Sequence, residues 1–588
     1  MPISRTSIRM APLVFPTALF VFAFFCLLGD LGRYYDDYAL AGRDPVSNAI
    51  DWTGNPWRHT PYFWRPLLFP FLHYTLGLLW DHMWVMHALN IICHGFVVLA
   101  LFTLLRRLGV SIEAAAVGTL LFAFYPLHFD VVFWSTAITT SLPAGLAVLL
   151  CLVYLRHVAV PRRATMATLI VLAFIIPCFY EQPVTLVPAL PLLYFAACPR
   201  EQPWRARLLH ASLPVVYMGL GLCVYIGLMF ATVPAARRGG AMSLVTPGEI
   251  FGRVGAVWGQ VLSFAGPQLR LFCEGAFALS WQTLGSWVGP LAAGAGLVGG
   301  VVWVRWFASG SEPAPGEQFQ SRPQRGWIII FAVSWFLLAW LPLVVIRDQL
   351  VYCRSFYTPL LPAAICLAVA LDGLFAVLQR KPWTAGLRVV VGGACVLAVT
   401  FSAFCFVGWQ VLHRARFAAN ERQLAALAAR VPMLPSGAVI VVLEDRFKPA
   451  ATQHYLFNNA LISWTGSWLT AQSALRHALN KDDIFSTHLN VWNPLPIVDP
   501  VPEGFTYHTP IPPYLDVAGH SRIPWAVTVP LCIDAAGDVS LVDRIILKAA
   551  DGSSREIRPP LVTSAVPGPV RSFTFPSVPI QSAYSRGE

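Results

Sequence analysis

Charged side chains are scarce in this chain. Only 12% of its 588 residues are Asp, Glu, Lys or Arg, whereas 56% are hydrophobic. A soluble domain usually carries about 25% charged residues. A water-soluble fold of this length is therefore excluded, because it could not hide so much apolar surface. The composition predicts a polytopic integral membrane protein.

Two further shortages exclude other classes of protein. None of the 12 cysteines forms a CxxC pair or a metal-type spacing, and several lie inside apolar runs, where they act as small hydrophobic residues. The net charge of +11 does not indicate a nucleic-acid partner. The basic residues sit in short loops between apolar runs, as membrane orientation requires.

About eleven apolar runs approach the roughly 20 residues that a membrane helix needs. A signal peptide is disfavoured at the first run, because no convincing small-residue cleavage site follows it. The stretch 249–284 is moderately apolar and is interpreted as an interfacial or re-entrant helix. The predicted spans lie near residues 11–29, 84–105, 113–128, 137–155, 165–180, 183–198, 208–231, 287–306, 327–346, 357–378 and 386–409.

The distribution of Lys and Arg predicts the orientation. With the N-terminus in the cytoplasm, every inside connection is basic, whereas the outside connections 129–136 and 180–183 contain no Lys or Arg. The N-terminus and the basic connections are thus expected on the cytoplasmic side. The outer face carries loop 30–83, loop 232–286 and everything after residue 410.

The composition changes after Trp409, where Asp, Glu, Asn, Thr and Pro become frequent. The sequence predicts a transmembrane domain, 1–409, and a periplasmic domain, 410–588, of mixed α/β or β-rich structure. In the second domain we expect an amphipathic helix at 416–431. Strands are expected at the three segments 437–443, 524–530 and 539–548.

The first outer loop contains the most informative residues. Asp36 and Asp37 are adjacent and follow the first span closely. Two neighbouring carboxylates held partly out of water do not both ionise cheaply, so one is a candidate general base for a hydroxyl nucleophile. A solvated acidic rim is the alternative. Arg65, before Pro66, is either a snorkelling arginine or a ligand for phosphate or carboxylate.

Three later outer connections also carry candidate residues. His128 and Asp130 lie where a span leaves the bilayer; Asp130 is a candidate for orienting a substrate hydroxyl, and a metal site is the weaker reading. Glu181 lies almost inside the membrane, where ionisable residues are functional candidates by default, although pairing with an Arg for packing also explains it. Arg347 and Arg354 are candidate ligands for a lipid phosphate.

The order of these motifs resembles the GT-C class of polytopic glycosyltransferases, which use polyprenyl-phosphate sugars. It is most similar to the protein O-mannosyltransferases, their relatives with tetratricopeptide repeats, and the bacterial homologues of both. The resemblance covers about residues 11–378. It implies a GT-C-like helical domain and a lipid-phosphate sugar donor.

The resemblance also implies roles for the acidic residues. Asp36 corresponds to the catalytic base and Asp37 to its acidic neighbour; a shift of one residue in the alignment exchanges the two. Asp130 corresponds to the acidic residue of the second outer loop, and His128 to the histidine of the same motif. Glu181 corresponds to a glutamate that usually follows a basic residue.

The remaining implications concern the donor and the acceptor. Arg354, with Arg65 or Arg347, would hold the donor phosphate. No cofactor is obligatory, because the phosphate leaves already charged, although some members bind divalent ions. Tyr180 precedes Glu181 in this chain, where the family usually has a basic residue. No tetratricopeptide repeat is found, so the C-terminal region leaves open whether the acceptor is protein, glycan or lipid.

Two other functions remain open at this stage. One is a transporter or flippase of lipid-linked sugars, which would share the spans, the basic groups and the buried carboxylate; paired broken helices in two related halves would favour it. The other is a catalytically inactive scaffold of the same fold. Neither the sugar nor an oligomeric state follows from the sequence.

Overall fold

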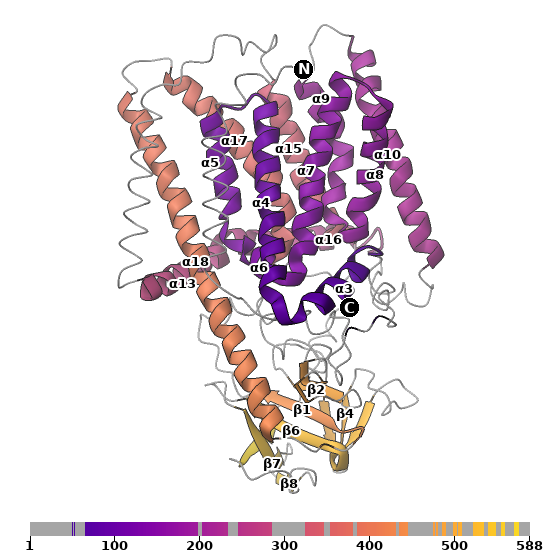
Figure 1. Cartoon of the computed structure of the whole chain (residues 1–588), viewed down its shortest axis with the longest axis vertical. Helices are drawn as coiled ribbons and strands as arrows, with labels where there is room; N and C mark the ends of the chain where they lie inside the picture. The colour runs from indigo at the N-terminus through magenta and orange to yellow at the C-terminus, as the bar shows by residue number, and fades with distance from the viewer. Residues whose placement is uncertain are drawn as a thin grey trace. The chain divides into compact units, whose positions relative to one another are not determined.

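The structure of the chain is a computed structural model (Figure 1). The structure describes residues 50, 52, 65–197, 203–232, 245–284, 324–345, 353–379, 385–430, 434, 436–444, 474–476, 478–479, 485–489, 498–501, 504–507, 521–533, 539–548, 554–558 and 570–575.

Helices account for most of the described chain up to residue 430 (Figure 1). The α-helices are α3 Leu68–Leu79, α4 Met83–Arg107, α5 Ile112–Ala123, α6 Phe129–Phe133, α7 Ile138–Ala159, α8 Arg163–Phe179, α9 Leu190–Ala197, α10 Trp204–Thr232, α12 Ile250–Ser263, α13 Leu269–Leu284, α15 Arg325–Ala339, α16 Leu341–Val345, α17 Tyr357–Gln379 and α18 Ala385–Arg430. Short turns of 3-10 helix connect them at η1 Trp80–His82, η2 Pro126–His128, η3 Ser135–Ala137, η4 Gln182–Ala189 and η6 Cys353–Phe356.

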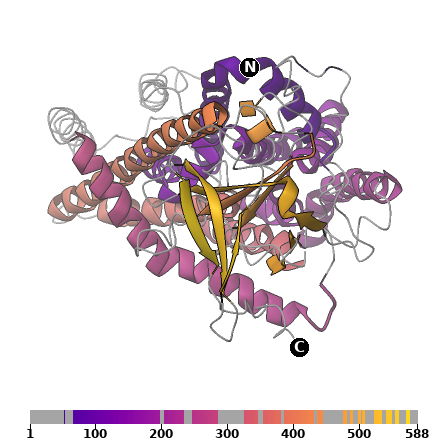
Figure 2. The same cartoon turned by 90° about the horizontal axis from the view of Figure 1, so that it is seen from below.

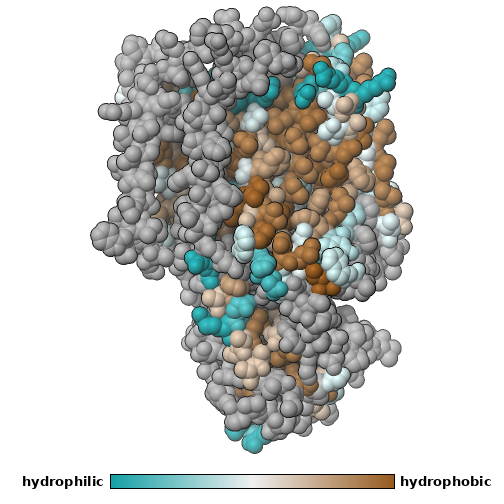
Figure 3. Space-filling model, in the orientation of Figure 1, coloured by the Kyte–Doolittle hydropathy of each residue, from teal (hydrophilic) through white to brown (hydrophobic). Residues whose placement is uncertain are grey.

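The protein is a multi-pass membrane protein. Among the described residues, six helical segments are long and apolar enough to cross a membrane, or seven if α5 and the helix after its 50° bend count as one span. Their outward side chains are largely apolar, and the face of the helical unit in Figure 3 is correspondingly brown along the middle of the helices. The six segments are Leu68–Arg107, Ser135–Ala159, Trp204–Thr232, Arg325–Val345, Arg354–Leu378 and Val390–Gln410.

The helices match the predicted spans in different ways. Each of the six long segments contains all or nearly all of one predicted span, and 113–128 corresponds to the bent pair. Spans 165–180 and 183–198 are shorter apolar helices at Arg163–Phe179 and Gln182–Ala197. The predicted spans 11–29 and 287–306 lie outside the described residues.

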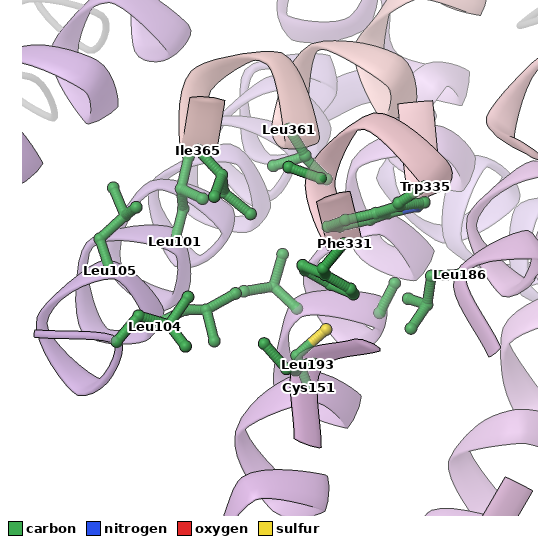
Figure 4. Close-up of a cluster of buried hydrophobic side chains, with 14 of the residues drawn as sticks. Leu101, Leu104, Leu105, Cys151, Leu186, Leu193, Phe331, Trp335, Leu361 and Ile365 are labelled. Carbon is green, nitrogen blue, oxygen red and sulfur yellow. The ribbon is translucent and has the colours of Figure 1, made fainter. Parts of the chain in front are cut away.

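One apolar core holds the helices together. The same buried cluster includes residues of α4, α15 and α17, among them Leu101, Leu104, Leu105, Phe331, Trp335 and Ile365 (Figure 4). Gly118 of α5 allows a close approach to α17, because a Cβ there would lie 2.9 Å from the Cβ of Ala368. Small residues at such crossings let membrane helices pack through backbone contact.

The segment 249–284 is helical, as expected, and α12 and α13 run crosswise to the bundle helices (Figure 2). Trp258 of α12 packs against Trp340, with ring centroids 6.2 Å apart, whereas Phe251 on the same helix is 87% exposed. A helix with one apolar face on protein and another left open is typical of an interfacial position.

Helix α18 corrects one prediction. The last span and the amphipathic helix at 416–431 were predicted as separate elements, but they form one continuous helix of 46 residues. No Pro or Gly interrupts residues 409–430. When the side chains change from apolar to polar, the helix passes from an apolar environment into water, but its backbone hydrogen bonds continue.

The C-terminal region is a mixed sheet structure, as predicted. One sheet has the order β2-β1-β6-β7-β8, with β9 also paired to β7. Strand β1 is parallel to β2 and β6, while β7 is antiparallel to β6 and β8. A second sheet has the order β3-β4-β5. The strands are β1 Val439–Glu444, β2 Phe485–Leu489, β3 Val498–Val501, β4 Gly504–Tyr507, β5 Ser521–Pro524, β6 Thr528–Ile533, β7 Val539–Lys548, β8 Ser554–Ile557 and β9 Val570–Phe575.

Two of the three predicted strands are confirmed at 439–444 and 539–548. The predicted strand 524–530 is only partly right, because the 3-10 turn η9, Trp525–Val527, separates β5 from β6. Contacts divide the chain into two compact units, one of residues 1–31, 55–75 and 81–412, the other of residues 32–54, 76–80 and 413–588.

Candidate functional site

Arg65 and Glu181 form an ion pair between the residues that precede α3 and the end of α8. The Nη2 atom of Arg65 donates to Oε2 of Glu181 at 2.8 Å, and Nε donates to Oε1 at 3.0 Å. The two side chains are 20% and 26% exposed. Burial alone would lower the pKa of Arg65, but the Glu181 carboxylate raises it above its usual value. This pair is a bidentate, charge-assisted contact.

Tyr180 lies beside the guanidinium of Arg65. The guanidinium carbon of Arg65 is 4.7 Å from the centroid of the Tyr180 ring. Burial raises the pKa of Tyr180, and the positive charges of Arg65 and Arg354 oppose that rise. The Arg65 guanidinium therefore packs on this ring, and both arginines contribute positive charge at the phenol. Tyr225 of α10 donates to the carbonyl oxygen of Pro177, three residues before Tyr180, at 3.1 Å.

Arg354 lies on the turn η6, directly before α17. Trp134 is the residue directly after α6, and the guanidinium carbon of Arg354 is 5.0 Å from the centroid of its ring. Gln182 holds this turn in place, since its Nε2 donates to the carbonyl oxygens of Ser355 at 2.9 Å and Ala339 at 3.0 Å. Gln182 follows Glu181, so one short segment, 180–182, connects the Arg65 side of the site to the Arg354 side.

Asn90 holds the turn that carries Trp134. It is fully buried, and its Nδ2 lies 2.5, 3.1 and 2.9 Å from the carbonyl oxygens of Val131, Val132 and Trp134. Its Oδ1 accepts a hydrogen bond from Ser141 at 2.9 Å. A buried carboxamide saturated in this way fixes the backbone around it. Asn90 therefore positions the surface on which Arg354 rests.

His128 lies in an aromatic cluster behind the arginine site. It is fully buried, with ring centroids 4.6 Å from both Phe122 and Tyr357. His94 is 6.0 Å away and joins Tyr357 by a 2.7 Å contact between Nδ1 and the phenol oxygen. Its Nε2 lies 3.0 Å from the carbonyl oxygen of Ala123. This pattern fits a neutral His94 whose Nε2 donates and whose Nδ1 accepts.

The remaining predicted site residues are less fully described. Asp130 lies in α6, which contacts the turn of Arg354, but its side chain is outside the described residues. Asp36, Asp37 and Arg347 also lie outside them. In the part of the chain that the structure describes, no group of three or more His, Cys, Asp or Glu side chains is suited to hold a metal ion.

The comparisons with known proteins assign this chain to no family. No family model and no curated protein matches it. A crystal structure of ArnT from Cupriavidus metallidurans bound to undecaprenyl phosphate is similar at 17% identity and a TM-score of 0.37, covering 80% of this chain and 85% of that one. The apo structure of the same protein has 15% identity and a TM-score of 0.36, covering 76% and 84%.

Three residues of this site were not predicted from the sequence: Asn90, Gln182 and Trp134. Asn90 and Gln182 are polar residues in or beside apolar runs. An amide without a hydrogen-bond partner costs several kcal/mol there, so the sequence already contained a signal for both residues. It indicated that each side chain has a buried partner, but it did not identify the carbonyl groups, because these come from distant parts of the chain. Trp134 had no such signal, since aromatic residues are common near membrane surfaces.

Breaking the Arg65–Glu181 pair should destabilise the protein. We expect Arg65→Gln or Glu181→Gln to cost about 2 kcal/mol, the range for hydrogen bonds to charged groups in partly buried sites. The double variant should cost clearly less than the sum, because the second substitution removes a group that has already lost its partner. Thermal unfolding of the four proteins in one detergent measures this coupling.

The Arg270–Glu274 pair on α13 is the matched control. These side chains are 78% and 55% exposed and lie one turn apart on the same helix. Water screens such pairs, so the same cycle should give additive changes in Tm. Equal coupling in both cycles would contradict a special role for Arg65 and Glu181.

Proposed function

We propose that this protein is a GT-C-type glycosyltransferase that moves a sugar from a polyprenyl-phosphate donor to an acceptor hydroxyl at the outer face of a bacterial inner membrane. The observation that carries the proposal is segment 180–182, which pairs with Arg65 through Glu181 and bonds through Gln182 to Ser355, the neighbour of Arg354. The site lies where the membrane-crossing segment Arg354–Leu378 begins, and a lipid phosphate would sit at such a depth.

The two arginines have different parts in this proposal. Arg65 donates two hydrogen bonds to Glu181 and so holds segment 180–182 in place. Arg354 rests on the ring of Trp134, where the membrane-crossing segment Arg354–Leu378 begins. A planar guanidinium forms two parallel hydrogen bonds to phosphate oxygens. We therefore assign phosphate binding mainly to Arg354, with Arg347 as a second candidate.

The chemistry follows from the proposed roles. Asp36, or Asp37 in its place, removes the proton from the acceptor hydroxyl, whose oxygen attacks the anomeric carbon of the sugar and inverts it. The bond from that carbon to the phosphate oxygen breaks, and the lipid phosphate leaves with its charge stabilised by Arg354. We propose no obligatory cofactor, and addition of a chelator tests whether a divalent ion contributes.

Donor turnover by the purified full-length protein tests the proposal. The donors are a panel of polyprenyl-phosphate sugars, with cell-envelope extract as the source of protein, glycan and lipid acceptors. Release of the lipid phosphate with transfer of the sugar supports a glycosyltransferase. Movement of the intact lipid-linked sugar across vesicles, without release, would replace it by the flippase. Neither activity, with donor still bound, would favour an inactive scaffold.

Substitution of the paired aspartates identifies the base. We expect one of Asp36→Asn and Asp37→Asn to lower turnover about 100-fold, the scale of a lost general base. The other variant should retain most activity. Donor binding and Tm should stay unchanged in both. Equal activity of both variants and the wild type would exclude this pair as the source of the base.

A further inference from the structure

Helices α13 and α18 approach closely where they cross (Figure 1, Figure 2). Ser280 of α13 donates from Oγ to the carbonyl oxygen of Phe404 at 2.5 Å. Gly408 of α18 faces the backbone of Ala276, and a Cβ added to it would collide with the Ala276 carbonyl group and lie 2.8 Å from Oγ of Ser280. Only glycine at 408 allows this approach.

Two cysteines meet in the same interface, about one turn from these contacts. Cys273 lies three residues before Ala276, and Cys405 lies three residues before Gly408. The thiol of Cys405 donates to the carbonyl oxygen of Cys273, with 3.6 Å from Sγ to O, and it also hydrogen-bonds the Cys273 thiol. A disulfide needs its two Cα atoms within about 4.4–6.8 Å, a separation that helices reach only at such close crossings.

The two thiols differ in access and reactivity. Cys273 is partly exposed, whereas Cys405 is fully buried. The hydrogen bond from Cys405 lowers the pKa of Cys273, which favours its thiolate. A thiolate is the form that attacks a disulfide. Cys273 is therefore the thiol that meets an external oxidant, and Cys405 is the thiol that resolves the intermediate.

We propose that Cys273 and Cys405 form a disulfide that joins α13 to α18. The predicted orientation puts Cys273 in the outer-face segment 232–286 and Cys405 near the outer end of the last span, on the side where disulfides form and persist. The oxidant is a disulfide-bearing oxidoreductase. The Cys273 thiolate attacks one of its sulfurs, forms a mixed disulfide and releases the other sulfur as a thiolate. Cys405, on losing its proton, then attacks Sγ of Cys273, breaks the mixed disulfide and releases the second sulfur of the oxidant as a thiolate. Two protein thiols are oxidised, and the disulfide of the oxidant is reduced to two thiols.

The bond would act on a segment that borders the arginine site. Phe264, between α12 and α13, packs on Phe356 of the turn η6, with ring centroids 5.5 Å apart. Trp258 packs on Trp340 in the same region. A covalent link at Cys273 would hold this crosswise segment against the bundle and thereby support the turn that carries Arg354.

Mass spectrometry of the full-length protein tests the proposal independently of any activity. The protein is isolated from membranes without reductant, denatured in detergent, alkylated with N-ethylmaleimide and digested. We expect most of Cys273 and Cys405 in one joined peptide, two hydrogen atoms lighter than the separate peptides. Dithiothreitol should convert it to two alkylated peptides. Cys223, which is exposed on α10, is the control and should be alkylated singly throughout.

Separately alkylated Cys273 and Cys405 in protein isolated without reductant would overturn the proposal, as would joining of either to a different cysteine. Two variants sharpen the test. Cys405→Ser should leave Cys273 fully alkylated. Gly408→Ala keeps both cysteines but separates the helices, and it should reduce the joined peptide several-fold. Unchanged joining in Gly408→Ala would contradict the role of the close helix crossing.

Discussion

Replacement of Arg354 by Glu is expected to reduce turnover of a polyprenyl-phosphate sugar about 1,000-fold, the upper range for loss of one group that stabilises developing charge. The substitution removes the guanidinium that rests on Trp134 and adds a carboxylate that repels the donor phosphate. Arg354→Lys should retain partial activity, because an ammonium group keeps the charge but lacks the planar fork. The measurements are turnover of the donor and binding of a polyprenyl phosphate.

The control for Arg354 is Arg163, which is exposed at the start of α8. This position is at the opposite end of the helix that leads to Tyr180. Arg163→Glu makes the same change in charge far from the site, so turnover should stay within about twofold, since surface charges at this distance are screened. Equal losses in the two variants would indicate an effect of net charge. Full activity of Arg354→Glu with normal folding would remove Arg354 from the mechanism.

Replacement of Asn90 by Leu is expected to lower the free energy of unfolding by about 3 kcal/mol, since unsatisfied buried polar groups cost about 1–3 kcal/mol each and partial rearrangement recovers some of that cost. The variant leaves the carbonyl groups of Val131, Val132 and Trp134 and the hydroxyl of Ser141 without this partner. Because the freed turn carries Trp134, donor binding should weaken as well. Thermal unfolding in detergent and lipid-phosphate binding measure the two effects.

Thr103→Val on the same helix is the control for Asn90. The Thr103 hydroxyl donates only back to the carbonyl oxygen of Leu99, within its own helix. Its loss leaves no distant group unsatisfied, so Tm and binding should barely change. Ser141→Ala should cost less than Asn90→Leu, because it removes one hydrogen bond and keeps the three contacts of the carboxamide. A wild-type Tm for Asn90→Leu would show that other groups hold this turn.

The segments of this protein that enter a membrane follow from local composition. A run of apolar residues near the length of the bilayer core can satisfy its backbone only as a helix, and the long helices duly coincide with predicted spans. The strand at 439–444 was predictable for a similar reason, since a short run of Val, Ile and Leu is typical of a buried parallel strand. Local composition did not predict that α18 is one continuous helix. Composition shows which residues prefer lipid and which prefer water, but it does not show whether the helix continues from one to the other.

The candidate site arises from contacts between distant parts of the chain. Arg65 and Glu181 are 116 residues apart, and Gln182 and Ser355 are 173 residues apart. A sequence shows that each is a polar group near a membrane surface that needs a partner. It does not show which partner, because that choice depends on how far each helix slides and turns against its neighbours. Packing at positions such as Gly118 and Trp335 sets this register. The sequence alone therefore determines the residue types and the membrane spans. Only the packed helices determine how Arg65, Tyr180, Glu181 and Arg354 are arranged.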